Sequence, residues 1–200
     1  MAHRPRAEMI AETRAKLVSA ARAAFGKVGY AEASMDDFTA GAGLTRGALY
    51  HHFGDKKGLF RAVLGEINSE MIVRLNEVSR KAPTRWQGFV DECVAYVEMA
   101  LEPEIQRIVL CDGPAVLGDP TQWPGQDDCI RVMSRNLQKL MDEGTIIEID
   151  PVAVAHQING ATLYASFFIA NAADPREASR KSVEALKLML GGLLSKSEAH

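Results

Sequence analysis

The feature that most constrains this chain is a tight turn between two short helical stretches in residues 34–59, SMDDFTAGAGLTRGALYHHFGDKKGL. Gly43 stands where the chain must turn sharply. Thr45 can cap a helix that begins at Arg46 by accepting a backbone N–H bond. The serine that opens the stretch precedes an aspartate by three residues, which is capping-box spacing and predicts a first helix over 35–42. The stretch therefore predicts a helix-turn-helix.

The second of these helices is dense in groups able to touch a nucleic acid. Arg46, Tyr50, His51 and His52 can donate to phosphates or base edges. Gly47 has no side chain to hold the backbone away from a groove. This composition favours DNA binding.

Seven residues of this stretch, placed behind an amphipathic helix, resemble the DNA-binding domain of the TetR family of bacterial transcriptional regulators. The resemblance covers residues 9–65 and joins turn chemistry, a capped short helix and the start of a following helix. The residues that carry it are Gly43, Thr45, Gly47, Tyr50, Phe53, Lys56 and Leu59.

The resemblance implies an all-α fold with an N-terminal three-helix helix-turn-helix domain, over 1–55, and a C-terminal helical ligand-binding and dimerisation domain, over 56–200. It implies a homodimeric repressor of a palindromic operator, whose recognition helices enter major grooves about 34 Å apart. A small molecule bound by the C-terminal helices would tilt the helix that links the domains and release the DNA. No cofactor is expected. The DNA-binding residues expected are Thr45, Arg46, Gly47, Tyr50, His51, His52 and Lys56.

The charge is divided along the chain in a way that suits this interpretation. Residues 1–61 hold ten Lys/Arg and six Asp/Glu, a balance of +4, whereas residues 62–200 hold thirteen and twenty, a balance of −7. Such asymmetry favours phosphate binding by the first part only.

Apolar residues at helical spacing predict further helices along the chain. The first begins near residue 8 and ends at Gly29. Turn-forming residues over 112–125 predict a connection with one helical turn inside it. The other predicted helices cover 56–80, 84–101, 103–110 and 127–143.

The segment 151–173 contains no charged residue over 23 positions. Polar residues such as His156 and Asn159 interrupt it, so we interpret it as a buried helix and not as a membrane span. One chain of this length has few helices to bury such a segment on all sides. We therefore expect a homodimer through helices 151–173 and 175–194, as a four-helix interface.

The effector site is expected among apolar side chains of the C-terminal helices with a few polar groups. For each of these residues, an ordinary core position is the alternative, and for His156 the alternatives are a buried, hydrogen-bonded histidine or an interface residue. The candidates are Trp86, Phe89, Cys93, Tyr96, Met133, Leu137, His156 and Asn159.

The cysteines Cys93, Cys111 and Cys129 form no CxxC pair, which argues against a disulfide framework and a zinc site. A redox-switched or unregulated DNA-binding protein is the alternative to a ligand-responsive one. An enzyme that uses a cysteine with His156 is a further rival, but no motif joins those residues. The N-terminus has no apolar run of a secretory signal, so we expect no membrane partner and a cytoplasmic location.

Overall fold

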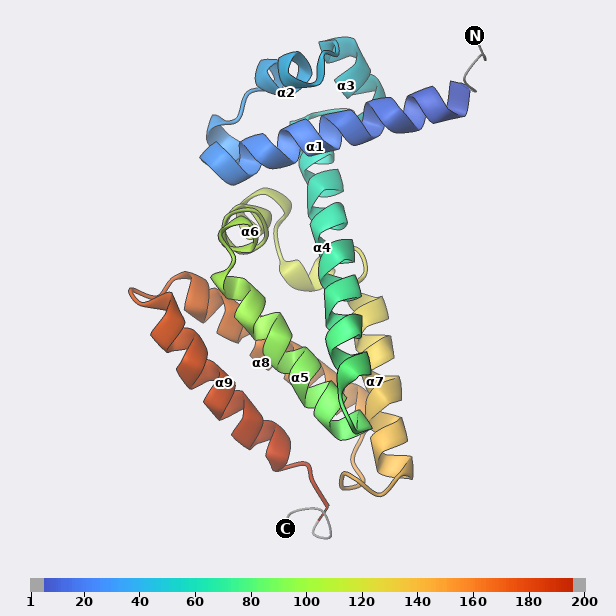
Figure 1. Cartoon of the computed structure of the whole chain (residues 1–200), viewed down its shortest axis with the longest axis vertical. Helices are drawn as coiled ribbons and strands as arrows, with labels where there is room; N and C mark the ends of the chain where they lie inside the picture. The colour runs from blue at the N-terminus through green and yellow to red at the C-terminus, as the bar shows by residue number, and fades with distance from the viewer. Residues whose placement is uncertain (1–5, 196–200) are drawn as a thin grey trace. The chain divides into compact units, whose positions relative to one another are not determined.

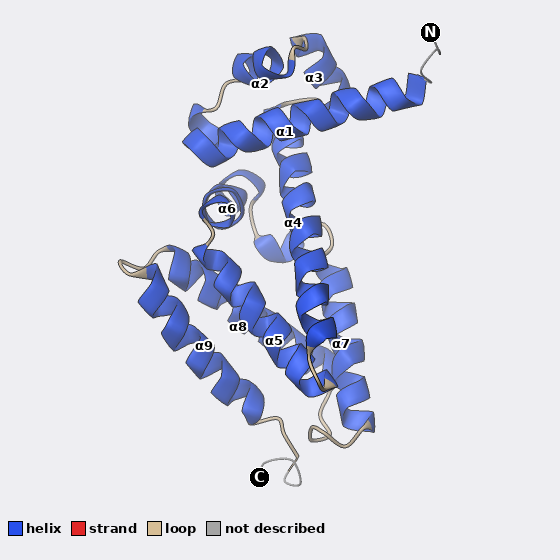
Figure 2. Ribbon diagram, in the orientation of Figure 1, coloured by secondary structure: helices blue, strands red, loops and turns tan. Residues whose placement is uncertain are grey.

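The computed structural model describes residues 6–195 and confirms the all-α fold (Figures 1 and 2). The chain divides into two compact units. The first runs up to Ser69 and also takes in Arg107–Pro120; the second takes Glu70–Gln106 and the chain from Thr121 onward. We call them the DNA-binding unit and the body.

The DNA-binding unit is built from α1 (Arg6–Glu32), α2 (Met35–Ala42), α3 (Arg46–Phe53) and the first part of α4 (Lys56–Lys81). Helices α2 and α3 lie along one side of α1 (Figure 1). Phe25 is the centre of the core, with its ring centroid 5.1 Å from that of Phe38 and 5.2 Å from that of Phe60. Completely buried apolar side chains around it are Leu17, Ala21, Leu49, Leu59 and Val63.

The regular part of α1 ends at Gly29, as predicted. Gly29 has φ 82° and ψ 171°, which breaks the helix, and one more turn follows to Glu32. A positive φ favours glycine because in other residues the Cβ comes too close to the neighbouring backbone carbonyl oxygen in this conformation. The sequence located the break correctly but not the turn that follows it.

The body contains the rest of α4, α5 (Arg85–Glu98), α7 (Gln126–Asp142), α8 (Pro151–Ala170) and α9 (Pro175–Gly191), with the 3₁₀ turn η1 (Met99–Leu101) after α5. Helix α8 packs against α5, α7 and α9.

Three helices of the body begin where the sequence provides a cap. Thr84 accepts from the N–H of Gln87, Asp150 from that of Ala153, and Asp174 from that of Glu177. In α8 and α9, a proline follows the cap, where its missing N–H costs no helical bond. Within residues 6–195, no helix is long and apolar enough to cross a membrane.

The region between α5 and α7 departs most from the prediction. A helix begins at Pro103, as expected, but it continues as a π-helix, η2 (Ile105–Asp112), and then as α6 (Gly113–Leu117). It stops at Gly118, whose φ of 83° turns the chain. The predicted connection over 112–125 is therefore helical in its first part, followed by the 3₁₀ turn η3 (Pro120–Gln122).

Candidate functional site

The turn between α2 and α3 has the geometry that its sequence predicts. Gly43 has φ 65°, and the N–H of Leu44 donates to the carbonyl of Thr39 at 2.8 Å. Thr45 then accepts from the N–H of Ala48 at 3.3 Å, which caps α3. The cap satisfies a backbone donor at the start of α3 and fixes the direction in which this helix leaves the turn.

Helix α3 presents most of the predicted DNA-binding side chains to solvent. Tyr50 is 53% exposed, and Arg46, Gly47 and His51 are exposed as well. His52 is half-buried, with its ring 5.4 Å from that of His51. Leu49, on the same helix, is fully buried, and α3 packs against α1 and α2. One face of the helix is thus left free for a partner.

Arg46 is already engaged by a residue that the sequence analysis did not select. Its Nε and Nη2 donate to the two carboxylate oxygens of Asp36 on α2, which forms a bidentate ion pair. The hydrogen bond from Arg46 holds the pKa of Asp36 below its ordinary value. Because this pairing occupies one edge of the guanidinium, the Nη1 edge remains available to a phosphate or base.

Lys56 is engaged by residues at the end of α1. Its ammonium donates to the carbonyl of Ala31 at 3.2 Å and lies 4.5 Å from the centroid of the Tyr30 ring. In this arrangement Lys56 ties the start of α4 to the end of α1. A phosphate contact by its ammonium would require these interactions to be exchanged.

The junction between α3 and α4 depends on a glycine that the sequence analysis passed over. Asp55 accepts from the N–H of Gly58 at 2.6 Å and so caps α4. A Cβ at Gly58 would lie 2.0 Å from the carbonyl oxygen of Phe53. The close approach of α4 to the end of α3 therefore needs glycine at this position.

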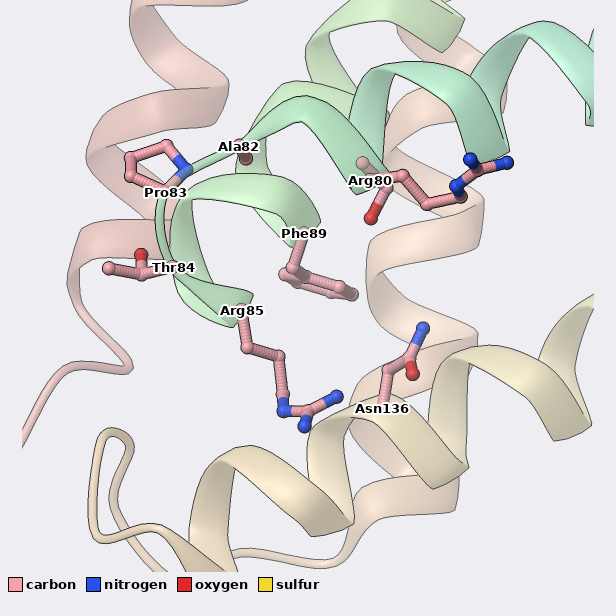
Figure 3. Close-up of a pocket in the computed structure, with 8 residues that line it drawn as sticks. Arg80, Ala82, Pro83, Thr84, Arg85, Phe89 and Asn136 are labelled. Carbon is pink, nitrogen blue, oxygen red and sulfur yellow. The ribbon is translucent and has the colours of Figure 1, made fainter.

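The body contains a cavity of about 350 Å³ at the turn between α4 and α5 (Figure 3). Phe89 points its ring into it from α5, and Arg85 and Asn136 reach it from α5 and α7. Of the predicted effector residues, only Phe89 lines this cavity. Its other lining residues are Ser79, Arg80, Ala82, Pro83 and Thr84.

The remaining predicted effector residues of α5 and α7 differ in burial. Cys93 and Leu137 are buried, with 4% and 1% of their surface exposed, whereas Trp86, Tyr96 and Met133 are half-buried. Burial raises the pKa of Cys93 and that of Tyr96 to about 12. A thiol so held in its protonated form is a poor nucleophile and a poor redox sensor.

Glu92 is a polar residue of this region that the sequence analysis did not select. It lies on α5, half-buried, and burial raises the pKa of its carboxyl although a hydrogen bond with Ser79 opposes that shift. It also raises the pKa of Cys129, after the larger effect of burial on that thiol. No apolar periodicity could single out Glu92, because a carboxylate on a helix is ordinarily a solvated group.

His156 lies in a different place from the other effector candidates. It is exposed and lines a groove of about 390 Å³ between α8 and α9, together with Ile158, Met189 and Leu190. Asn159 is half-buried and does not line either cavity. The eight predicted effector residues are thus not brought together into one site.

The outer face of α8 and α9 carries large apolar side chains in solvent. We call it the α8/α9 face; its residues are Tyr164 and Phe168, 75% and 54% exposed, and Leu188 and Met189, 74% and 63% exposed. In contrast, Thr162 and Ser166 of α8 are buried within the subunit, where each hydroxyl donates to a backbone carbonyl of its own helix.

Two family models match the chain. The model described as "Bacterial regulatory proteins, tetR family" matches residues 17–63, and the model described as "Tetracyclin repressor-like, C-terminal domain" matches residues 86–193. The first match contains the helix-turn-helix. The second contains all the residues that line the groove between α8 and α9 but, of those that line the cavity beside Phe89, only Phe89 and Asn136.

The chain is also similar to proteins of known structure or function. The crystal structure of a TetR-family transcriptional regulator from Pectobacterium atrosepticum is 51% identical, with 96% of this chain and 99% of that chain covered and a TM-score of 0.88. The HTH-type transcriptional repressor AcnR of Corynebacterium glutamicum is 28% identical over 72% of this chain and 74% of its own length. RolR, whose structure contains resorcinol as ligand, shares the fold at 21% identity, with 97% and 94% of the two chains covered and a TM-score of 0.67.

Proposed function

The chain belongs to the TetR family of bacterial transcriptional regulators, and from that premise we propose that it is a homodimeric repressor that leaves a palindromic operator when a small molecule binds. The observation that carries the proposal is the capped helix α3, whose exposed face gathers donors on a unit with an excess of positive charge. We assign DNA binding to residues 1–55 and effector binding and dimerisation to residues 56–200.

In this proposal, α3 enters the major groove. Arg46 contacts a base edge or phosphate through the guanidinium edge that Asp36 leaves free, and His51 lies beside a base or a thymine methyl group. Tyr50 and His52 contact phosphates, and Gly47 lets the backbone approach. Thr45 donates to a phosphate while it caps α3. Lys56 contributes a phosphate contact only if its ammonium leaves Ala31 and Tyr30.

The dimer forms through α8 and α9, in our proposal, by burial of the α8/α9 face. Exposed apolar side chains of this size on neighbouring helices mark a surface that a partner covers. The same surface patch of a second copy would meet it in a two-fold arrangement.

We place the effector between α5 and α7, at or next to the cavity beside Phe89. RolR holds resorcinol in a structure that shares this fold, which supports a small-molecule site in the body without identifying the ligand. Glu92 and Tyr96 are half-buried polar side chains of α5, and in this proposal they select the effector by hydrogen bonding. Cys93, Leu137 and Met133 then serve as apolar wall, with Trp86 at the edge.

We propose neither a catalytic role nor a redox switch. The raised pKa of Cys93 disfavours both roles for that thiol, and the chain's relatives are regulators. A test with a thiol oxidant covers the exposed Cys111. The proposed DNA target places the protein in the cytoplasm, and the proposal involves no membrane.

The experiment is a gel shift with the protein and the DNA upstream of its own gene, at low salt. The proposal predicts that a fragment containing a palindrome is retained and that Arg46→Ala weakens this binding. It also predicts that a thiol oxidant leaves binding unchanged. Failure to retain any such fragment contradicts the repressor proposal, and loss of binding with oxidant alone would favour the redox alternative.

A further inference from the structure

The break in α1 at Gly29 is held by two side chains from far along the chain. Arg107 donates from Nη2 to the carbonyl of Val28 at 2.9 Å, and Asp112 accepts from the N–H of Tyr30 at 2.7 Å. The two side chains also pair, with Arg107 Nε 3.7 Å from Asp112 Oδ2. We call this set of contacts the α1 dock; all of its residues belong to the DNA-binding unit.

The α1 dock is closely fitted. Gly29 is buried, and a Cβ on it would lie 2.0 Å from Nη2 of Arg107, so the guanidinium lies against the bare backbone. The side chain of Asp112 is only 15% exposed. Asp112 also stands at the N-cap of α6 yet makes no capping bond there. Its carboxylate is thus committed to Tyr30 and Arg107.

The π register of η2 is what brings Arg107 and Asp112 together. In a π-helix the backbone bonds join residues five apart, so residues five apart lie near one face. In an α-helix, at 3.6 residues per turn, residues five apart point about 140° away from each other. An α-helical register over the same residues would therefore turn at least one of the pair away from α1.

The helix that carries the dock also begins in the other unit. Ile105 and Gln106 pack with the body, whereas Arg107–Pro120 pack with the DNA-binding unit. A change of register that starts in the body would pass along this helix into the dock. Among all helices, π-helical segments are rare and occur often at functional sites.

We propose that the π register of η2 is a regulatory device in which Arg107 and Asp112 are positioning residues that hold α1 and its helix-turn-helix ready for DNA. Conversion of η2 to an α-helix separates the pair, frees the break at Gly29 and weakens operator binding. An effector that favours the α register then releases the DNA. This inference rests on the proposed function, because it requires an operator.

Preorganisation determines whether the docked or the released state binds the operator more tightly. A symmetric operator requires two recognition helices in fixed positions at once. A DNA-binding unit whose α1 is held in one conformation loses less freedom on binding than one whose α1 is released. The docked state is therefore the one that binds the operator more tightly.

The first experiment compares Arg107→Ala and Asp112→Ala with wild type, after each protein has been used to select sites from a random DNA library. Both variants should exchange the Tyr30 amide hydrogen faster and bind the selected operator about 5- to 150-fold more weakly, the usual range of allosteric coupling. Affinity for random DNA should not change. Arg131→Ala, which removes an arginine from an exposed pair on α7, is the matched control and should match wild type. Asp112→Asn keeps an acceptor for Tyr30 and should recover part of the loss.

The second experiment tests the register itself. Deletion of the exposed Cys111 leaves the arginine and the aspartate four residues apart, which is the spacing that an α-helix presents on one face. Insertion of an alanine before Asp112 sets them six apart. The deletion should retain operator affinity and the insertion should lose it, with helical content of both checked by circular dichroism.

The outcomes separate this inference from the proposed function. If wild type selects no DNA sequence, the proposed function fails and this inference fails with it. If wild type selects an operator but Arg107→Ala binds it equally well, only the inference is overturned. Equal losses from the deletion and the insertion would also overturn it, since the register would then have no special role.

Discussion

Gly58 is the residue at which the smallest change should have the largest effect on stability. A Cβ there would lie 2.0 Å from the backbone oxygen of Phe53, which cannot rotate away. Gly58→Ala should destabilise the protein by about 1–3 kcal/mol, as overpacking does. Gly65 lies on the same helix with no heavy atom within 4 Å of its Cβ position, so Gly65→Ala should stabilise by up to about 1 kcal/mol. Urea unfolding of both variants measures the two signs; a neutral Gly58→Ala would contradict this packing.

In the proposed DNA complex, the pairing with Asp36 sets the orientation of the Arg46 guanidinium. Asp36→Ala removes a negative charge near the phosphates and frees both edges of the guanidinium. Affinity for random DNA should rise, because an unpaired cation contributes to sequence-independent binding. The ratio of operator to random affinity should fall, since the arginine is no longer held in one orientation. Competition binding at two salt concentrations measures both quantities, and an unchanged ratio would show that Asp36 has no part in specificity.

The cysteines should differ sharply in reactivity. Cys111 is exposed, whereas Cys93 is buried and its thiol pKa is raised to about 12. Since only the thiolate reacts, Cys93 should stay unmodified by a thiol reagent at pH 8 while Cys111 is labelled. Because folding raises the pKa of Cys93, ionisation of this thiol opposes folding. The stability of the fold should therefore fall as the pH rises above 9.0, the ordinary pKa of a cysteine thiol. Mass spectrometry of native and unfolded protein distinguishes the sites, and rapid labelling of Cys93 in the native state would contradict its burial.

At the scale of elements, the sequence located helices well where local chemistry decides them. The start of α3 follows from the cap at Thr45, and the starts of α4 and α9 follow from Asp55 and Asp174. The cap of α8, Asp150, was not predicted; that helix was recognised by its lack of charge. The bounds predicted for α2 agree with those observed.

Features that depend on distant contacts were not predictable. The π-helix η2 has the same apolar periodicity as a short α-helix. The contacts of the α1 dock join Val28 to Arg107 and Tyr30 to Asp112, which are separated in the sequence by 79 and 82 positions. Nothing in the sequence near Gly29 predicts that Arg107 contacts the backbone there. The candidate effector residues had the same limit, because an apolar side chain at helical spacing suits a core as well as a pocket.

The exposed face of α8 was also decided by packing rather than by composition. The helix has no charged residue, so the sequence left its outward side undetermined, and the structure turns Tyr164 and Phe168 outward. On α9, Leu190 is only 2% exposed, so a charge placed there would disrupt the subunit itself, whereas Leu188 is 74% exposed.

This face makes a clean test of the dimer. Tyr164→Asp combined with Leu188→Asp should give folded monomers, because each charge would be buried without a partner in the dimer. Val132→Asp, at a 51% exposed position on α7, is the control and should leave the dimer intact. Light scattering gives the mass and circular dichroism the fold. A dimer that survives the double change would contradict an interface through α8 and α9.

At the scale of the whole molecule, net charge of opposite sign is carried by two unequal parts of the sequence. Residues 1–61 carry the positive balance and the exposed donors of α3, and residues 62–200 carry the negative balance and both cavities. In a repressor, the positively charged part binds DNA. The negatively charged part does not bind DNA and remains available to an effector. If the proposed effector contacts both the half-buried Glu92 and the ring of Phe89, it should combine an apolar body with a hydrogen-bond donor.

Selection of binding sites from a random DNA library is the measurement that tests the central claim most directly. A homodimer that reads DNA with α3 should enrich a two-fold symmetric sequence, with half-sites separated by about 34 Å, or one helical turn and its multiples. The same protein with Arg46→Ala should lose enrichment at one base pair of each half-site. Enrichment of no sequence, or of a single half-site without symmetry, would contradict the account.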